Sequence, residues 1–172
     1  MSNTLSFLTI REANAEDADE VATVFQAAFA PLRAIYRPNS KTVARQSLHH
    51  REGTRLVAEL DQQVVATVQF DSHEDFLSLL GLAVHPHFQR KGIARGLLDW
   101  INSHALATGR TAITLQTIRQ TASVPLFEKL GFRVIGERVT DGFESDIHTE
   151  LHEVKMLRSI SASNGTIPRR LP

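Results

Sequence analysis

A short basic segment with one glycine is the part of the chain best suited to binding a phosphate group. Arg90 and Lys91 precede Gly92, and apolar residues recur at helical spacing from Ile93 onward. The first turn of a helix has free backbone N–H groups and the positive end of the helix dipole, which favour an anion. Gly92 has no side chain to keep phosphate oxygens away from those N–H groups. The segment therefore predicts an anion site, and a flexible helix entry with solvated charges is the alternative.

The residues on either side of this segment predict the elements that position it. Residues 76–84 form a short, almost continuous apolar run, as in a strand covered on both faces. Pro86 ends that strand because it cannot donate a ladder hydrogen bond, and Gly109 ends the following helix. Gly81, near the middle of the strand, indicates a bulge, a ligand close to the backbone, or room for a bulky neighbour. A strand opened beside an anion site suits an elongated ligand such as coenzyme A.

Two longer motifs include these features. The first is residues 82–86 followed by residues 89–94, and the second is residues 120–132. Together they resemble the acetyl-CoA signature of the GCN5-related N-acetyltransferase (GNAT) superfamily, over about residues 8–157. Within the second motif, Gln120 stands where the family usually has asparagine. Phe127 stands where many members have the tyrosine that protonates the departing thiolate, so the resemblance implies that this general acid is absent.

The resemblance also implies a cofactor and a fold. The cofactor is acetyl-CoA as acyl donor, with its pantetheine on the backbone of residues 82–84 and its pyrophosphate in the loop 89–94. The predicted cofactor-binding residues are Leu82, Ala83, Val84, Gln89, Arg90, Lys91, Gly92, Ile93, Ala94, Gln120 and Phe127. The implied fold is α/β (α+β), with a mixed, mostly antiparallel central sheet of six to seven strands and about four helices. That sheet is splayed between its fourth and fifth strands.

Hydrophobic periodicity along the rest of the chain is consistent with one such domain over residues 5–158. Strands are predicted at residues 5–11, 54–60, 64–71, 112–116, 133–139 and 150–158, with a tight turn at 61–63 and a long loop at 140–149. Helices are predicted between Asn14, with Asp17 as its capping partner, and Pro31, and at residues 41–52 and 121–130. Residues 32–40 are predicted to connect the first two helices and, by the resemblance, to form one wall of the acceptor cleft. Residues 159–172 read as a flexible tail.

Composition excludes several classes of function. The 172 residues contain no cysteine, so disulfides, a cysteine nucleophile and zinc–thiolate sites are excluded. The 19 basic and 19 acidic residues cancel, which favours a small molecule or a peptide over nucleic acid or an anionic membrane. No signal-like or bilayer-length apolar run is present, so we expect a cytoplasmic protein, either monomer or homodimer. No metal site is predicted, since His85 and His87 flank a proline and converge poorly.

No residue stands out as the catalytic base, so the catalytic residues are unknown from sequence. Acyl transfer to an amine is helped by a carboxylate or imidazole that accepts the ammonium proton. The base candidates are His85, His148 and His152. Further candidates are His73, Glu74 and Asp75 before the strand at 76–84, and Asp146 near the last hairpin. A solvated surface position is the simpler interpretation of each.

Two functions fit these patterns. The first is an acetyl-CoA-dependent N-acetyltransferase that acts on a primary amine of a small molecule or peptide by direct attack in a ternary complex. The alternative is a non-catalytic acyl-CoA sensor or partner domain, which the phenylalanine at position 127 favours. The last predicted hairpin is acidic, with Asp141, Glu144, Asp146, Glu150 and Glu153. This charge suits a cationic amine or polyamine, and it equally suits a loop kept soluble.

Overall fold

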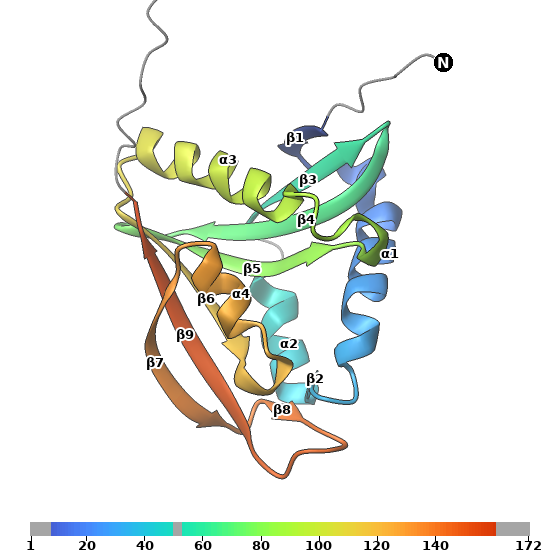
Figure 1. The fold of residues 1–172 in the computed structure, drawn as a ribbon, viewed down its shortest axis with the longest axis vertical. Coiled ribbons are helices and arrows are strands. Elements are labelled where there is room, and N and C mark those ends of the chain that lie inside the picture. Colours follow the sequence, from blue (N-terminus) through green and yellow to red (C-terminus); the bar gives the residue numbers. More distant parts are fainter. Residues whose placement is uncertain (1–7, 50–52, 161–172) are drawn as a thin grey trace, which may run out of the picture.

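The protein is built around one seven-stranded sheet, seen in a computed structural model that describes residues 8–49 and 53–160 (Figure 1). Its strands lie in the order β1-β3-β4-β5-β6-β9-β7, and among the described residues only β5 and β6 pair in parallel. These strands are β1 (Leu8–Glu12), β3 (Thr54–Leu60), β4 (Gln63–Ser72), β5 (Phe76–Val84), β6 (Ala112–Ile118), β7 (Arg133–Thr140) and β9 (Leu151–Ser159). The predicted mixed, mostly antiparallel sheet is confirmed.

Two helices cover opposite faces of this sheet. These two are α1 (Ala18–Phe29) and α3 (Ile93–Ala107). The described residues also form α2 (Ser40–His49), α4 (Val124–Lys129) and short 3-10 turns at Ala15–Asp17, Ala30–Leu32, Pro86–Phe88 and Arg119–Thr121. Leu56 and Ala58 of β3 belong to the core beneath α3, whereas Val57 between them belongs to the core beneath α1. This alternation is the period of a strand, so α1 and α3 lie on opposite faces.

Among the described residues, no helix combines the length and apolar character needed to cross a bilayer.

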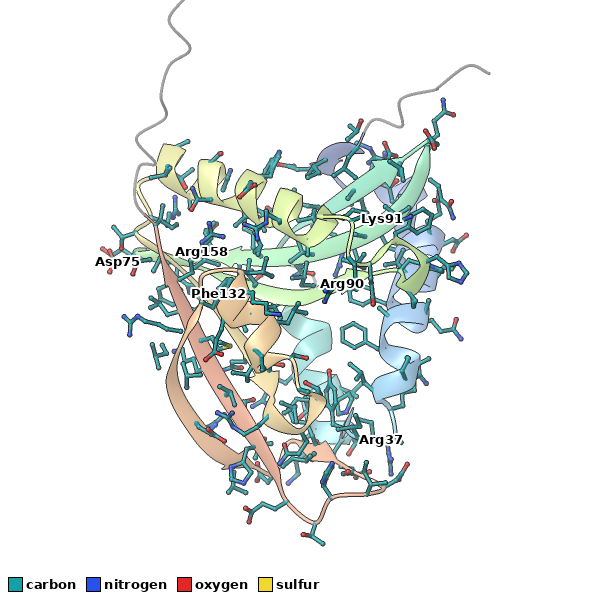
Figure 2. The ribbon with its side chains drawn as sticks, in the orientation of Figure 1. Arg37, Asp75, Arg90, Lys91, Phe132 and Arg158 are labelled. Atoms are coloured by element: carbon teal, nitrogen blue, oxygen red, sulfur yellow. The ribbon has the colours of Figure 1, made fainter. Side chains whose placement is uncertain are left out.

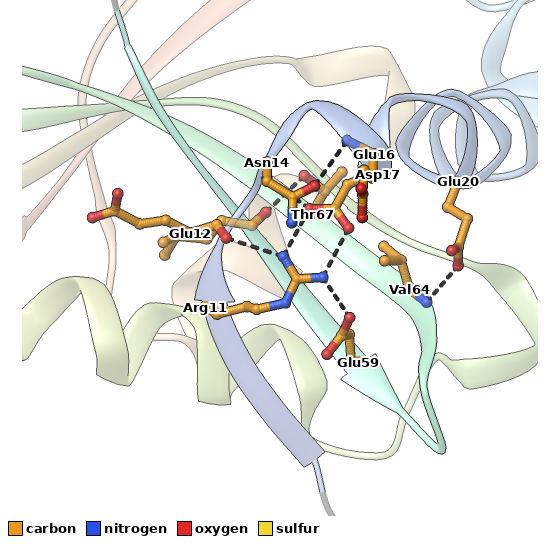
Figure 3. Close-up of polar contacts among 10 residues, drawn as sticks. Arg11, Glu12, Asn14, Glu16, Asp17, Glu20, Glu59, Val64 and Thr67 are labelled. Carbon is orange, nitrogen blue, oxygen red and sulfur yellow. Dashed lines mark hydrogen bonds and ion pairs between the residues drawn. The ribbon is translucent and has the colours of Figure 1, made fainter.

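A charged network joins the first strand to the first helix (Figure 3). The Asn14 side chain accepts a hydrogen bond from the Glu16 N–H at 2.8 Å, and the Asp17 carboxylate accepts one from the Asn14 N–H at 2.7 Å. Arg11 donates to both oxygens of Asp17, at 2.7 and 2.8 Å, and also to Glu59. The predicted capping pair is confirmed. Hydrogen bonds from Arg11, and then from the Asn14 backbone, lower the pKa of the buried Asp17 to about 2, although burial opposes them.

This depressed pKa predicts an acid-sensitive contribution to stability. The pKa of Asp17 is lower in the folded state than its ordinary value of 3.8, so the contribution is complete above about pH 4 and disappears as the pH falls to about 2. Replacing Asp17 with asparagine is expected to lower the free energy of unfolding by about 1–3 kcal/mol at pH 7. The difference from the wild type is expected to shrink between pH 4 and pH 2.

Urea unfolding at several pH values measures this difference. Asp19→Asn is the matched control, because Asp19 is exposed in the first turn of α1 and its carboxylate has no partner among the described residues. A gap between wild type and Asp17→Asn that stays constant down to pH 2 would contradict the linkage.

Two segments predicted to be irregular pair with each other. Strand β2 (Arg37–Pro38) runs antiparallel to β8 (Phe143–Glu144), so both the connection at 32–40 and the long loop at 140–149 contain short strands. The Asn39 N–H donates to the Gly142 carbonyl at 3.0 Å and extends this contact. Strands of two residues are too short to show alternation, and their partners lie far apart in the sequence. The long loop is therefore fastened to the segment between α1 and α2.

Two predicted segments, the helix of the second motif and the C-terminal tail, begin later than expected. Helix α4 starts at Val124, whereas residues 121–130 were predicted to be helical. Ala122 has a positive φ of 58°, which ends the preceding 3-10 turn and separates it from α4. The predicted tail also begins later, because Ser159 belongs to β9 and Ile160 packs against the core. Predicted positions 5–7, 50–52 and 161–172 lie outside the described residues.

Candidate cofactor and acceptor site

The sheet opens between β5 and β6. These strands pair over Phe76–Ser78 and Ala112–Thr114 only, and in Figure 1 they then diverge into a V with α4 inside it. From residue 79 to residue 84, the β5 edge that faces β6 has no strand partner in the described part of the chain. An unpaired strand edge offers N–H and C=O groups to an extended ligand. The predicted splay between the fourth and fifth strands of the main sheet is confirmed at this point.

A bulge in β5 lies within the opened segment. Gly81 and Leu82 together oppose the single residue Val68 of β4, and Gly81 has φ of +59°. A Cβ on Gly81 would lie 2.9 Å from Cε1 of Phe25 on α1. The conformation and the close neighbour both require glycine here. Two of the interpretations of Gly81 from the sequence, the bulge and the bulky neighbour, are therefore both confirmed.

The loop after β5 forms a concave set of backbone groups at the start of α3. Arg90 has φ of +65° and Gly92 has φ of +81°, so left-handed conformations alternate around Lys91. Such alternation turns successive N–H groups toward one side and creates an anion-binding hollow. The first turn of α3 has no acidic residue and receives no side-chain cap, and a Cβ on Gly92 would meet no atom within 4 Å. The loop therefore has the shape and the polarity that a pyrophosphate needs.

Two cations and an amide side chain lie at this loop. Figure 2 shows Arg90 and Lys91 where the V is wide, close to the start of α3. The Lys91 ammonium lies 5.3 Å from the centre of the Phe88 ring, and the Arg90 guanidinium has no partner among residues 8–49 and 53–160. The Gln89 Nε2 atom donates to the Val84 carbonyl at 3.0 Å, which ties the loop to the strand end. Positive charge is thus available beside the hollow.

The comparisons with known proteins agree with this geometry. The model of the acetyltransferase (GNAT) family matches residues 19–132. This chain belongs to the GNAT family. The cofactor of the family is acetyl-CoA, and the opened β5 edge and the 89–94 loop described above fit its pantetheine and its pyrophosphate.

Solved structures of several acetyltransferases have the GNAT fold seen here. The ribosomal-protein-S18-alanine N-acetyltransferase of Escherichia coli is 22% identical with a TM-score of 0.68, over 94% of this chain and 99% of that one. An N-acetyltransferase of Staphylococcus aureus Mu50 is 20% identical with a TM-score of 0.68, over 91% and 100%. The structure of yncA from Salmonella typhimurium with its cofactor acetyl-CoA is 22% identical with a TM-score of 0.64, over 95% and 99%. At these identities the likeness concerns the fold.

The two residues that depart from the GNAT pattern make structural contacts. The Gln120 amide donates to the Glu150 carbonyl at 3.3 Å and accepts from the His152 N–H at 3.2 Å, which fastens the turn before α4 to β9. Phe127 is half-buried, and its ring lies edge-on to that of Phe132 at 6.0 Å between centroids. The predicted cofactor contacts of Gln120 and Phe127 stay predictions.

The three histidine candidates are not brought together. His85 follows β5, where its Nδ1 accepts a hydrogen bond from the His87 N–H at 3.3 Å. His148 is exposed in the loop between β8 and β9. His152 is in β9, which pairs with β6 on the other arm of the V (Figure 1). The His152 ring lies 3.0 Å from the Glu150 carboxylate and 3.4 Å from that of Glu137. No one of them is singled out as the base.

Most acidic residues of the last hairpin have cationic partners. Arg37 pairs with Asp146 at 2.6 Å and with Glu144 at 3.6 Å, and Arg138 pairs with Glu153 at 2.7 Å. Arg119, in the turn after β6, donates hydrogen bonds to both carboxylate oxygens of Glu137 in β7. These hydrogen bonds lower the pKa of Glu137. Sequence reasoning missed the Arg119–Glu137 pair, because a short turn and a strand give no signal that they will meet. Three of the five acidic residues predicted for the hairpin are therefore within ion-pair distance of an arginine.

A cavity of about 310 Å³ lies at the end of α1 and the segment that follows it, which includes the residues predicted to form the acceptor wall. Its lining residues are Phe29, Leu32, Arg33, Tyr36, Arg37 and Pro38. Phe29 stacks on Phe25 with ring centroids 5.7 Å apart, and Phe25 is the residue that packs against Gly81. One turn of α1 therefore separates the cavity from the residue that packs against the β5 bulge.

Proposed function

We propose that this protein transfers the acetyl group of acetyl-CoA to a primary amine of a small molecule or peptide, by direct attack in a ternary complex. The observation that carries the proposal is the unpaired edge of β5 beside the anion-binding start of α3. Free backbone groups followed within a few residues by an anion-binding loop support the binding of an extended thioester donor. GNAT enzymes act on amine acceptors of these kinds.

Acetyl-CoA supplies an activated thioester: the amine nitrogen forms a bond to the acetyl carbon, the carbon–sulfur bond breaks, and a proton passes from nitrogen to the thiolate. The chain's own part is to orient and to stabilise. Backbone N–H groups near Val84 would hydrogen-bond to the acetyl oxygen as it gains negative charge. The loop 89–94 would hold the pyrophosphate. The base that accepts the amine proton, directly or through water, stays open among His85, His148 and His152.

Release of free CoA thiol from acetyl-CoA tests the proposal, with simple amines, amino acids, polyamines and peptides as acceptors. Calorimetric titration with acetyl-CoA is run in parallel. Acceptor-dependent release together with acetylated product would establish the transferase. Tight binding without release from any acceptor would instead favour an acyl-CoA sensor, a second candidate supported by Phe127 at the usual tyrosine position. Absence of binding would overturn both.

Restoring a hydroxyl at position 127 tests whether thiolate protonation limits the rate. Phe127→Tyr is expected to raise kcat about fivefold near pH 7 because it supplies a general acid, with the dissociation constant of acetyl-CoA nearly unchanged. The gain is modest because a thiolate leaves readily without an acid. The control is Phe76→Tyr, which adds a hydroxyl at the narrow end of the V, where β5 still pairs with β6. An unchanged kcat in folded Phe127→Tyr would show that protonation is not limiting.

A further inference from the structure

The cavity beside α1 contains two polar groups that lack a partner in the described part of the chain. These are the guanidinium of Arg33 and the hydroxyl of Tyr36. The remaining wall is largely apolar, from Phe29, Leu32 and Pro38. A mostly apolar cavity with a few convergent polar groups is the usual form of a small-molecule site, and about 310 Å³ is at the lower end of the range for such sites. The space therefore suits a small acceptor better than a peptide.

Tyr36 is half-buried and held in place by an aromatic neighbour. Its ring packs edge-on against Phe143 of β8, with centroids 5.5 Å apart, and burial raises the pKa of its hydroxyl. A neutral hydroxyl in such a position is a hydrogen-bond donor. The pairing of β2 with β8 fixes this wall, so the donor is positioned before any ligand arrives.

Arg33, an exposed lining residue, is a cation without a partner in the described part of the chain. Arg37, by contrast, already binds Asp146 at 2.6 Å and lies 3.6 Å from Glu144, so its charge is taken up by two carboxylates. In Figure 2, Arg37 lies below Arg90 and Lys91, toward β8. Arg33 is the cationic lining residue whose side chain has no ion pair or hydrogen bond among the described residues. A carboxylate would supply that partner, and an arginine fork matches it in two bonds.

We propose that the acceptor is a small amino acid with an apolar side chain, whose carboxylate binds Arg33 and Tyr36. This inference rests on the proposed function, because it assumes that the amine of the same molecule is acetylated. Phe29 lines the cavity and stacks on Phe25, which packs against Gly81, so the proposal places the amine on the side of the cavity nearer the opened β5 edge. In this proposal the hairpin carboxylates Asp146 and Glu144 pair with Arg37, and they do not bind the amines of a polyamine.

Matched acceptors test the proposal. Leucine, leucinamide and 3-methylbutylamine share the same branched carbon chain and an amine. Leucine alone carries a carboxylate, which is a neutral amide in leucinamide and absent in 3-methylbutylamine. Leucine is expected to have a kcat/KM about 10- to 100-fold higher than the other two, as expected for hydrogen bonds to a charged group. Arg33→Gln is expected to remove this preference mainly through KM, and Arg33→Lys to restore part of it. Arg133→Gln is the control, because Arg133 is exposed on β7.

A binding measurement separates this inference from the transferase itself. Titration of the CoA-loaded protein with 4-methylpentanoate and its neutral amide, followed by NMR, needs no acetyl transfer. Arg33-dependent binding of the acid would support the anion site even if no acceptor released thiol, an outcome that would overturn the transferase alone. Thiol release that is equal for leucine and 3-methylbutylamine and unaffected in Arg33→Gln would overturn the inference and keep the transferase. Preference for the amine, a polyamine or a peptide would also overturn it.

Discussion

Replacing Gly92 with aspartate is expected to weaken acetyl-CoA binding by about a hundredfold while the protein stays folded. The new carboxylate would stand at the start of α3, where the pyrophosphate is predicted to bind, and two like charges about 4 Å apart repel by roughly 1–4 kcal/mol depending on solvent access. A Cβ at this position meets no atom within 4 Å, so there is no clash. The positive φ of +81° adds a strain of roughly 1–2 kcal/mol.

The same helix provides the matched control at its other end. Gly109 has φ of +75°, and a Cβ there also meets no atom within 4 Å. Gly109→Asp therefore introduces the same strain and the same charge, at a distance of a whole helix from the predicted phosphate site. Calorimetric titration with acetyl-CoA compares the variants, and thermal unfolding checks that both are folded. Equal affinities for Gly92→Asp and Gly109→Asp would contradict the assignment of the loop.

Replacing Gly81 with valine is expected to lower the free energy of unfolding by about 3 kcal/mol and to abolish acetyl transfer. The strain has two sources. A β-branched residue is disfavoured at φ of +59°, and its Cβ would lie 2.9 Å from the Phe25 ring. Relief of that clash moves either α1 or the end of β5, and both border the proposed reaction site. Stability and activity therefore fall together.

Urea unfolding and thiol release measure the two effects. Gly136→Val is the control, since Gly136 lies in β7 without a positive φ and a Cβ there meets no atom within 4 Å. The double variant Gly81→Ala with Phe25→Leu separates the two sources of strain. It is expected to be more stable than Gly81→Ala alone, because the shorter side chain removes the clash and leaves the backbone strain. Equal stability of Gly81→Val and Gly136→Val would show that the bulge tolerates a side chain.

The parts of the fold that local sequence encodes were predicted well. The apolar run at 76–84, Pro86 and the periodic residues after Gly92 produce a strand, a loop and a helix. The capping pair Asn14 and Asp17 forms as expected, at the 3-10 turn that leads into α1. Each of these features depends on residues within a few positions of one another. Caps, proline breaks and side-chain periods have that range.

The cofactor half of the site belongs to the same category. Its anion-binding geometry comes from consecutive residues, with left-handed φ at Arg90 and Gly92 immediately before α3. The neighbouring strand is the preceding element in the chain. A contiguous segment was therefore enough to indicate the ligand class, and the residues that contact the ligand stay a prediction.

The acceptor half depends on tertiary structure alone. The pairing of β2 with β8 closes the wall around Tyr36, and Arg37 meets Asp146 across most of the chain. Those contacts decide which charged side chains have an ion-pair partner, and Arg33 has none among the described residues. Two-residue strands and single ion pairs have no periodic signature. The sequence by itself thus determined the cofactor loop and the order of the main strands and helices, whereas the charge and shape of the acceptor cavity were decided only by long-range packing.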